Sequence, residues 1–330
     1  SQEMLARLHR RSMLNTPVDV WEEMTRVTLQ VIARTLFGFN AEARFTTIKA
    51  AFDRLNEDIS GRLRSIFPYP LWLPTLRNLR FRKALSTLDE VVMEIIAERR
   101  TVDRPNGDLL THLLSKDPGS KDDEMSEKQV RDEVVTMLLA GHETTAALIT
   151  WAIHLLSLHP RIAAQLKLEI DETLGHRPLS FEQLDEFEFT QCVLEESLRL
   201  YPPIWIISRT AREQDRIGDQ AIDAGTNLLI SPYTMHRHPD YWHEPQNFNP
   251  YRFNKDKTNT RPSLAYIPFG AGPRLCIGRD FAMLEAKIIL ISLLQDFNIT
   301  PVSDSLLQPE PLVTLRPASK PMVQLEARNR

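Results

Sequence analysis

A glycine-rich stretch ahead of an apolar segment places the strongest constraint on this chain, because it holds one of the two cysteines. The stretch reads Phe-Gly-Ala-Gly-Pro-Arg-Leu-Cys-Ile-Gly from Phe269 to Gly278. Gly270 and Gly272 allow a tight turn with close backbone approach. The apolar segment over 279–295 predicts a helix, whose positive N-terminal end would face Cys276 and favour its thiolate form.

The environment of Cys276 leaves several roles open. Most cysteines of intracellular proteins are buried and inert, whereas a thiolate that accepts N–H groups from Ile277 and Gly278 would be a nucleophile or a metal ligand. A catalytic thiol needs a histidine base nearby, and a zinc site needs several cysteines or histidines at short spacing. The residues around Cys276 offer neither. A single thiolate ligand to haem iron fits the stretch better.

The same stretch resembles a known family. Phe269, Gly272, Arg274, Cys276 and Gly278 match Phe-x-x-Gly-x-Arg-x-Cys-x-Gly, the signature of the cytochrome P-450 haem-thiolate monooxygenases. The resemblance implies a mainly α-helical fold with small β-sheets. It also implies haem b with Cys276 as its iron ligand, Phe269 and Arg274 beside the cofactor, and insertion of one atom of O₂ into an apolar organic substrate.

Composition agrees with a globular enzyme and excludes other classes. The chain has 330 residues, 42% hydrophobic and 25% charged, with a net charge of −4. Charges of both signs are interspersed, so nothing predicts a nucleic-acid partner, and two cysteines make no disulfide framework. No apolar run reaches membrane-spanning length, and we therefore expect a cytoplasmic protein. The chain begins at Ser1, apparently inside a helix, so an upstream membrane anchor stays open.

The first third of the chain reads as helices, with apolar residues at helical spacing over 3–39, 41–63 and 79–100. The connection from Phe67 to Trp72 is rich in aromatic residues and proline. From its residues alone, this connection is predicted to be a packed loop. With the resemblance, a packed loop and a mobile roof over the substrate are equally well supported.

A long helix is predicted from a capping box at Ser126 and Gln129 to about His159. Upstream, 104–124 reads as polar loops around one short helix. The long helix holds Ala-Gly-His-Glu-Thr-Thr over 140–145. Glycine, a carboxylate and two hydroxyl residues are unfavourable inside a buried helix, so this segment predicts a function or a kink.

The resemblance gives the 140–145 segment a role beside bound dioxygen. Glu143 and Thr144 match the family's proton-delivery residues, and Ala140 the substrate pocket. We expect the Thr144 hydroxyl to donate to the Ala140 carbonyl. The alternative is a kinked helix with an incidental surface Glu143. His142 is not expected to bind iron, because the family's residue there faces away from the cofactor.

Two further helices, over 160–175 and 187–200, lead to Glu196 and Arg199, which share a helix face. Such a pair alone is usually a weak surface ion pair. However, Asn-Pro-Tyr-Arg-Phe over 249–253 resembles the family element whose arginine, here Arg252, completes a buried Glu–Arg–Arg cluster that locks the cysteine loop.

The last third predicts short strands over 204–210, 216–222, 227–231, 312–316 and 321–327. Arg209 and His236 match positions that meet haem propionates. By composition alone the residues after Pro203 belong to the core, whereas the resemblance makes them line the substrate pocket: Ile204, Trp205 and Ile206.

The resemblance covers nearly all of residues 1–330, read as a single catalytic domain that lacks the family's N-terminal part. We expect the strands near 204–210 and 227–231 to be left uncovered and to promote aggregation. No flavin or iron–sulfur module follows, so electrons from NAD(P)H would arrive through a flavoprotein or ferredoxin, steered by Lys255, Lys257 and Arg279. Arg252 and Arg274 are expected to be buried. A haem-binding fragment without turnover, or a peroxide-driven or isomerase enzyme, remains the alternative.

Overall fold

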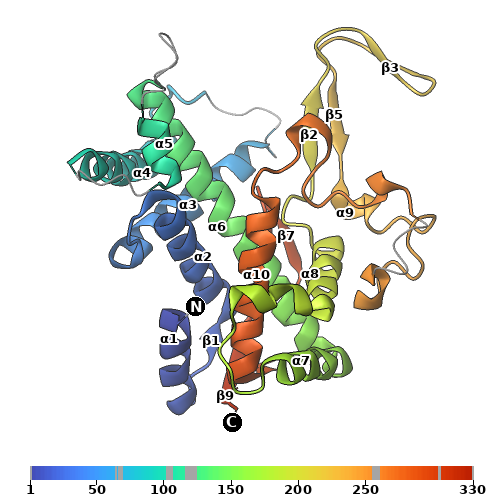
Figure 1. Cartoon of the computed structure of the whole chain (residues 1–330). Helices are drawn as coiled ribbons and strands as arrows, with labels where there is room; N and C mark the ends of the chain where they lie inside the picture. The colour runs from blue at the N-terminus through green and yellow to red at the C-terminus, as the bar shows by residue number, and fades with distance from the viewer. Residues whose placement is uncertain are drawn as a thin grey trace. The chain divides into compact units, whose positions relative to one another are not determined.

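The computed structural model describes residues 2–63, 65, 70–101, 107–115, 125–254, 261–303 and 306–328. The chain divides into two compact units. The smaller unit comprises residues 21–146, and the larger unit comprises residues 1–20 and 147–330. Figure 1 shows the order of their elements along the chain.

The smaller unit is helical. Its elements are α2 (Val20–Phe37), η1 (Glu42–Arg44), α3 (Phe45–Leu63), α4 (Leu76–Thr101), α5 (Leu109–Leu114) and the first part of α6 (Glu127–Leu158). Two helices begin at side-chain caps, since Asp108 accepts from the Thr111 N–H and Ser126 forms a capping box with Gln129. The apolar faces meet in a core around Leu29, Ile96, Leu110 and Val134, each at most 1% exposed.

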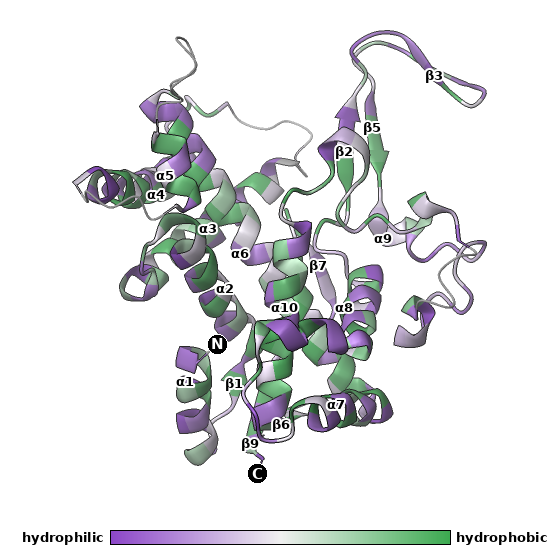
Figure 2. Ribbon diagram, viewed as in Figure 1, coloured by the Kyte–Doolittle hydropathy of each residue, from purple (hydrophilic) through white to green (hydrophobic). Residues whose placement is uncertain are grey.

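The larger unit contains the remaining helices. These helices are α1 (Gln2–Met13), the end of α6, α7 (Pro160–Leu174), α8 (Glu188–Leu200), α9 (Pro232–Met235) and α10 (Arg279–Asp296). Figure 2 shows apolar residues along α10, which contacts α7 and α8. Trp151, Val193, Leu290 and Phe297 are fully buried in this core. Their burial supplies the main stabilisation of the unit.

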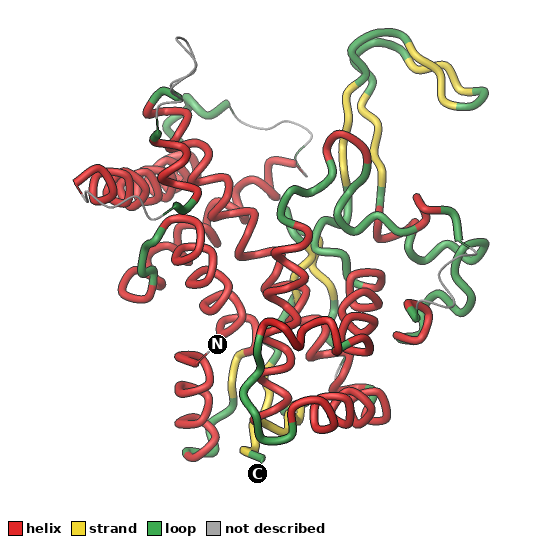
Figure 3. Tube along the Cα trace, in the orientation of Figure 1, coloured by secondary structure: helices red, strands yellow, loops and turns green. Residues whose placement is uncertain are grey.

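Small antiparallel sheets complete the larger unit. A three-stranded sheet has the order β1 (Val18–Asp19), β9 (Met322–Ala327), β6 (Phe297–Pro301). Three two-stranded pairs join β2 (Ile207–Thr210) to β5 (Asn227–Ile230), β3 (Asp215–Ile217) to β4 (Gln220–Ile222), and β7 (Pro309–Pro311) to β8 (Leu315–Pro317). The β3–β4 hairpin forms the outer end of the ribbon that starts with β2 and β5 (Figure 3).

Short 3₁₀ helices lie within the loops between β5 and α10. They are η3 (Pro250–Phe253), η5 (Ser263–Ala265) and η6 (Gly272–Arg274), and a further one, η2 (Phe181–Glu186), precedes α8. η3 begins with Pro250 and η6 has Pro273 as its second residue, and the fixed φ of proline suits the first turn of a helix.

The prediction of a mainly helical chain with small sheets is confirmed, and the bounds of the long helices lie within a few residues of those predicted. The strand expected over 204–210 begins only at Ile207. The Trp205 carbonyl accepts from the Ser231 hydroxyl and the Tyr233 N–H, so it takes no part in the strand ladder. The strands β1, β6 and β7 were missed. β1 and β7 have two and three residues, which are too few to show alternation.

Phe67, Pro68 and Tyr69 of the expected roof lie outside the described residues, whereas Trp72 is described and is 73% exposed. Among the described helices, none combines the length and hydropathy that crossing a membrane requires.

Candidate functional site

The Cys276 loop is closed by its own backbone. The Cys276 N–H donates to the Phe269 carbonyl at 3.0 Å, and the Leu275 N–H donates to the Gly272 carbonyl at 3.0 Å. Gly270 and Gly272 have φ of +77° and +69°, a region that other residues adopt only with strain. The two glycines are therefore required by the turn that presents the thiol ahead of α10.

The thiol of Cys276 lies at the surface among exposed apolar side chains. Ile277 is 92% exposed and Leu275 is 46% exposed, and Phe269 is half-buried. Within the described part of the chain, the sulfur accepts no hydrogen bond, so the expected N–H groups of Ile277 and Gly278 do not reach it. Exposed apolar side chains around a thiol at a helix N-terminus fit an apolar, thiolate-bound cofactor such as haem.

The other cysteine, Cys192, is buried, whereas Cys276 is exposed. Cys192 lies beside Trp242 and Phe253, and burial raises the pKa of its thiol to about 11. The thiol is neutral at neutral pH, so Cys192 is a core residue.

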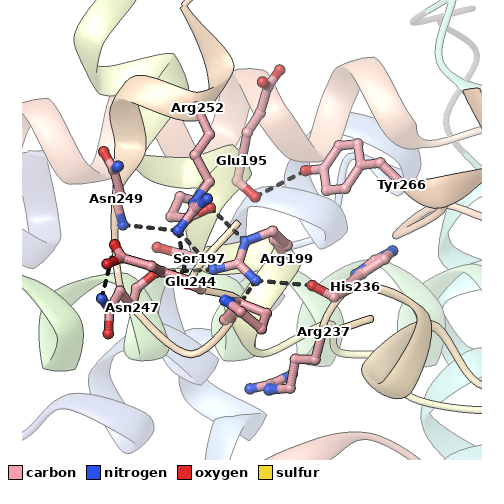
Figure 4. Close-up of polar contacts among 12 residues, drawn as sticks. Glu195, Ser197, Arg199, His236, Arg237, Glu244, Asn247, Asn249, Arg252 and Tyr266 are labelled. Atoms are coloured by element: carbon pink, nitrogen blue, oxygen red, sulfur yellow. Dashed lines mark hydrogen bonds and ion pairs between the residues drawn. The ribbon is translucent and has the colours of Figure 1, made fainter. Parts of the chain in front are cut away.

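The pair Glu196 and Arg199 is fully buried at the end of α8. Figure 4 labels Arg199 together with His236, Asn247 and Arg252. Arg199 Nε and Nη2 donate to the two Glu196 oxygens at 2.7 and 2.8 Å. The remaining guanidinium N–H groups donate to the carbonyls of His236, Pro245 and Asn247 at 2.9, 2.7 and 3.0 Å. All five donors of the guanidinium are thus satisfied, which is the condition for burying the charge.

Arg252 joins the same carboxylate from η3. Its Nε donates to Glu196 Oε1 at 3.3 Å, and its Nη2 donates to the Glu244 carbonyl at 2.8 Å. The Asn249 N–H also donates to Glu196 Oε1, at 2.8 Å. The structure therefore brings Glu196, Arg199 and Arg252 together, with Arg252 half-buried.

Two hydrogen bonds connect this cluster to the segment that precedes the Cys276 loop. The Ile267 N–H donates to His236 Nε2 at 2.9 Å, and the Tyr266 hydroxyl donates to the Glu195 carbonyl at 2.9 Å. Burial lowers the pKa of His236 to about 3, so its ring is neutral and Nε2 is available as an acceptor. The carbonyl of His236 in turn accepts from Arg199.

The residues expected beside the propionates occupy different environments. Arg209 on β2 is exposed and donates only to the Ser208 carbonyl among the described residues. His236 is 0% exposed, and its Nε2 accepts from the Ile267 N–H. The expectation that Arg274 is buried is wrong, because Arg274 is exposed at the end of the one-turn η6.

The residues expected to line the substrate pocket, Ile204, Trp205 and Ile206, are all half-buried in the irregular segment before β2. Trp205 is anchored, since its Nε1–H donates to the Leu312 carbonyl at 2.9 Å between β7 and β8. The indole face is therefore held in one orientation.

The polar residues at the middle of α6 belong to the smaller unit. The Thr144 hydroxyl donates to the Ala140 carbonyl at 2.8 Å, as expected, and Thr145 donates to the Gly141 carbonyl at 3.2 Å. Glu143 is 4% exposed, so it is not an incidental surface residue. A Cβ on Gly141 would lie 2.6 Å from Ile32 Cδ1, so glycine lets α2 approach α6 closely.

His142 is held by packing rather than placed as a ligand. It is 2% exposed, its Nδ1–H donates to the Leu138 carbonyl at 2.6 Å, and its ring lies 4.9 Å from that of Phe52.

Asn56 on α3 was missed by the sequence analysis. Its Nδ2 donates to both oxygens of Glu143, at 2.7 and 2.6 Å, and Asn56 is 3% exposed. A signal did exist, because Asn56 lies on the apolar stripe of Ile48, Phe52 and Leu55, where a polar residue needs a buried partner.

Within the described ranges, no group of three or more His, Cys, Asp or Glu side chains is arranged to hold a metal ion. A zinc site of the usual kind therefore has no support in this part of the chain. The Cys276 thiol on the glycine-rich loop stays the best-supported candidate for a metal ligand.

Comparisons with known proteins agree with this arrangement. The sequence model of the cytochrome P-450 family matches residues 1–325. Pentalenene oxygenase of Streptomyces avermitilis is 34% identical over 320 residues, which cover 95% of this chain and 70% of that protein. Cyclooctat-9-en-7-ol 5-monooxygenase of Streptomyces melanosporofaciens is 35% identical over 286 residues, which cover 86% of this chain and 62% of that protein.

The crystal structure of the cytochrome P-450DA heme domain matches with a TM-score of 0.89 and 28% identity, covering 99% of this chain and 71% of that one. The chain thus spans between 62% and 71% of the length of these three relatives. The family match extends over almost every residue, and the resemblance first drawn from the Cys276 stretch is confirmed. The chain belongs to the cytochrome P-450 family of haem-containing monooxygenases.

Proposed function

We propose that this chain forms the haem-thiolate region of a monooxygenase that inserts one atom of O₂ into an apolar organic substrate. The observation that carries the proposal is the exposed Cys276 thiol, which lies among exposed apolar side chains and follows a segment tied to the buried Glu196 and Arg199. These hydrogen bonds would hold the Cys276 sulfur in place and leave it accessible to a metal ion.

Cys276 would bind the iron through its sulfur, with Phe269 and Leu275 against the cofactor. The exposed guanidinium groups of Arg209 and Arg274 would pair with the propionates. When bound, haem would supply the redox chemistry that activates dioxygen, favoured by electron donation from the thiolate.

Glu143 and Thr144 would deliver protons. The Thr144 hydroxyl already donates to the Ala140 carbonyl, so its oxygen can accept a hydrogen bond from the opposite side. Glu143 is held by the Asn56 amide, and a carboxylate in that position can take a proton at one oxygen and release it from the other. Ala140, one turn before Thr144 on α6, would contact the substrate.

The substrate would be apolar. Ile204, Trp205 and Ile206 present apolar side chains, and the anchored indole of Trp205 would act as a fixed wall. The names of the two bacterial relatives refer to pentalenene, a hydrocarbon, and to the alcohol cyclooctat-9-en-7-ol, which supports an apolar substrate here.

Electrons would come from NAD(P)H through a flavoprotein or ferredoxin. Arg279 at the start of α10 is exposed, so it could steer an acidic partner. Its pair with Asp280 at 2.9 Å would offset part of that attraction. Lys255 and Lys257, the other two positions proposed for steering, lie outside the described residues.

The test is the optical spectrum of the purified protein, reduced and under carbon monoxide. We expect the far-red Soret band of thiolate ligation. Cys276→His should retain some haem but lose that band and the oxygenase activity, because imidazole donates less electron density than a thiolate. Cys192→Ala is the matched cysteine control and should keep both. A thiolate band that survives in Cys276→His would overturn the assignment, and a normal band without product in the parent would favour a haem-binding fragment without turnover.

A further inference from the structure

The face of α3 that meets α6 in the smaller unit carries polar side chains in a buried position. Asn56 and Ser60 lie one helical turn apart, so they share this face, and they are 3% and 4% exposed. One turn earlier, Phe52 contacts the His142 ring at 4.9 Å. Phe52, Asn56 and Ser60 therefore form a line along α3, two of whose members touch consecutive residues of α6.

The orientation of the Asn56 amide follows from its neighbour. Its Nδ2 donates to both Glu143 oxygens, and the reverse orientation would set a carbonyl against a carboxylate, which are both acceptors. Its Oδ1 is buried and finds no hydrogen-bond partner in the described ranges. A buried amide oxygen of this kind requires a donor.

Ser60 presents the same feature. Its Oγ is buried and has no hydrogen-bond partner among the residues that the structure describes. The buried helical hydroxyls of Thr28, Thr145 and Ser197 donate to the carbonyl four residues earlier, whereas Thr150 Oγ1, like Ser60 Oγ, has no partner among the described residues. The Ser60 hydroxyl is therefore available to another group.

We propose that Asn56 and Ser60 are positioning residues for Glu143, and that Asn56 Oδ1 and Ser60 Oγ bind ordered water that supplies protons to its carboxylate. Side chains one turn apart on a helix lie about 5–6 Å from each other at Cβ, a gap that one bridging water can span. The two orphaned atoms provide the polar partners that a buried water needs. The proposal rests on the proposed function of Glu143 in proton delivery.

The proton balance needs no further reactant. The bridging water gives one proton to the Glu143 carboxylate and regains one from the next water, and solvent at the outer end of the water chain supplies the proton that enters it. The carboxylate takes the proton at one oxygen and releases it from the other. Meanwhile Asn56 neither gains nor loses a proton, since it only holds the carboxylate and the water in line.

The experiment compares Asn56→Leu and Ser60→Ala with the parent in two measurements. The first is the infrared carboxylate stretch of Glu143, identified by its loss in Glu143→Gln. The second is product formed per NAD(P)H consumed, with its solvent isotope effect. Glu57→Gln is the matched control, because Glu57 follows Asn56 on α3 but its side chain is 63% exposed.

Asn56→Leu should shift the carboxylate stretch, because two N–H donors are lost, and should lower product per NAD(P)H by about tenfold with a larger isotope effect. Ser60→Ala should leave the stretch in place and lower the product ratio by about threefold, and Ser60→Thr should restore it by returning the hydroxyl. If Asn56→Leu does not fold, Asn56→Gln keeps the amide while displacing it and should still shift the stretch.

An unmoved stretch in both Asn56 variants, or parental product ratios and isotope effects in Asn56→Leu and Ser60→Ala, would overturn the proposal. These results differ from a failure of the proposed function, which would appear as a missing thiolate band in the parent under carbon monoxide. The infrared measurement does not require haem, so it tests Asn56 in either case.

Discussion

The guanidinium of Arg199 donates to both carboxylate oxygens of Glu196, one turn earlier on α8, and neither side chain is exposed to solvent. The same guanidinium donates to the carbonyls of His236, Pro245 and Asn247. One side chain therefore fixes three points of the segment between α9 and η3. The site depends on this cluster for its shape, because His236 also holds Ile267 ahead of the Cys276 loop.

Arg199→Lys should destabilise the protein strongly even though it keeps the charge. An ammonium has three donors against five in the guanidinium, so buried acceptors are left without partners. We expect the free energy of unfolding to fall by about 3–5 kcal/mol, with loss of haem content, as measured by urea unfolding and absorbance.

The matched control is Arg216→Lys, whose side chain is 68% exposed in a 3.7 Å pair with Asp219. That change should shift the free energy of unfolding by less than about 1 kcal/mol. Equal stability of Arg199→Lys and the parent would show that the cluster is dispensable.

Thr144→Ala should consume NAD(P)H but form less product, because the proposed function assigns proton delivery to the Thr144 hydroxyl. Product per NAD(P)H should fall by about tenfold, with a matching rise in hydrogen peroxide. Thr145→Ala is the neighbouring control, since its hydroxyl is buried and donates to Gly141 within the helix. Unchanged coupling in Thr144→Ala would assign Thr144 a purely structural role.

The free energy of unfolding should fall as pH drops below about 6.5. Burial lowers the pKa of His154 to about 4 and that of His236 to about 3. Between these values and the ordinary pKa, the unfolded chain binds protons that the folded chain excludes, so acid favours unfolding. Each histidine contributes a slope of up to about 1.4 kcal/mol per pH unit.

The measurement is urea unfolding at several values between about pH 7 and pH 5. In His154→Gln, the free energy of unfolding should depend less steeply on pH, by about one proton. The side-chain carbonyl of the glutamine can still accept from the Leu307 N–H, as His154 Nε2 does at 3.3 Å. The same slope in this variant and in the parent would contradict the assignment of a depressed pKa to His154.

The exposed apolar residues of β5 should make the chain prone to aggregation. Leu229 and Ile230 are 67% and 42% exposed, on a strand that Figure 2 shows as hydrophobic. Leu229→Thr should raise the concentration at which light scattering detects aggregates, with a change in stability of about 0.5 kcal/mol or less. Leu228→Thr, at a half-buried neighbouring position, should lower stability without this benefit. Equal aggregation of Leu229→Thr and the parent would exclude this strand as the cause.

Local spacing in the sequence was enough to predict the elements whose physics is local. The capping box at Ser126 and Gln129, the turn that requires Gly270 and Gly272, and the donation from Thr144 to Ala140 all join residues at most seven positions apart. The i,i+3 spacing of Glu196 and Arg199 placed them on one helix face in the same way. The family itself was recognisable from the stretch ending at Gly278.

Only the tertiary structure decided which of these polar groups are buried and what they contact. Asn56 and Glu143 are 87 positions apart in the sequence, and Arg199 and His236 are 37 positions apart. A local pattern therefore cannot identify the partner in either contact. The neutral state of His236 and the exposure of Arg274 likewise follow from the surrounding packing. The physical reason is that desolvation and hydrogen-bond partners, which set the charge and orientation of a side chain, come from segments that meet only when the chain folds.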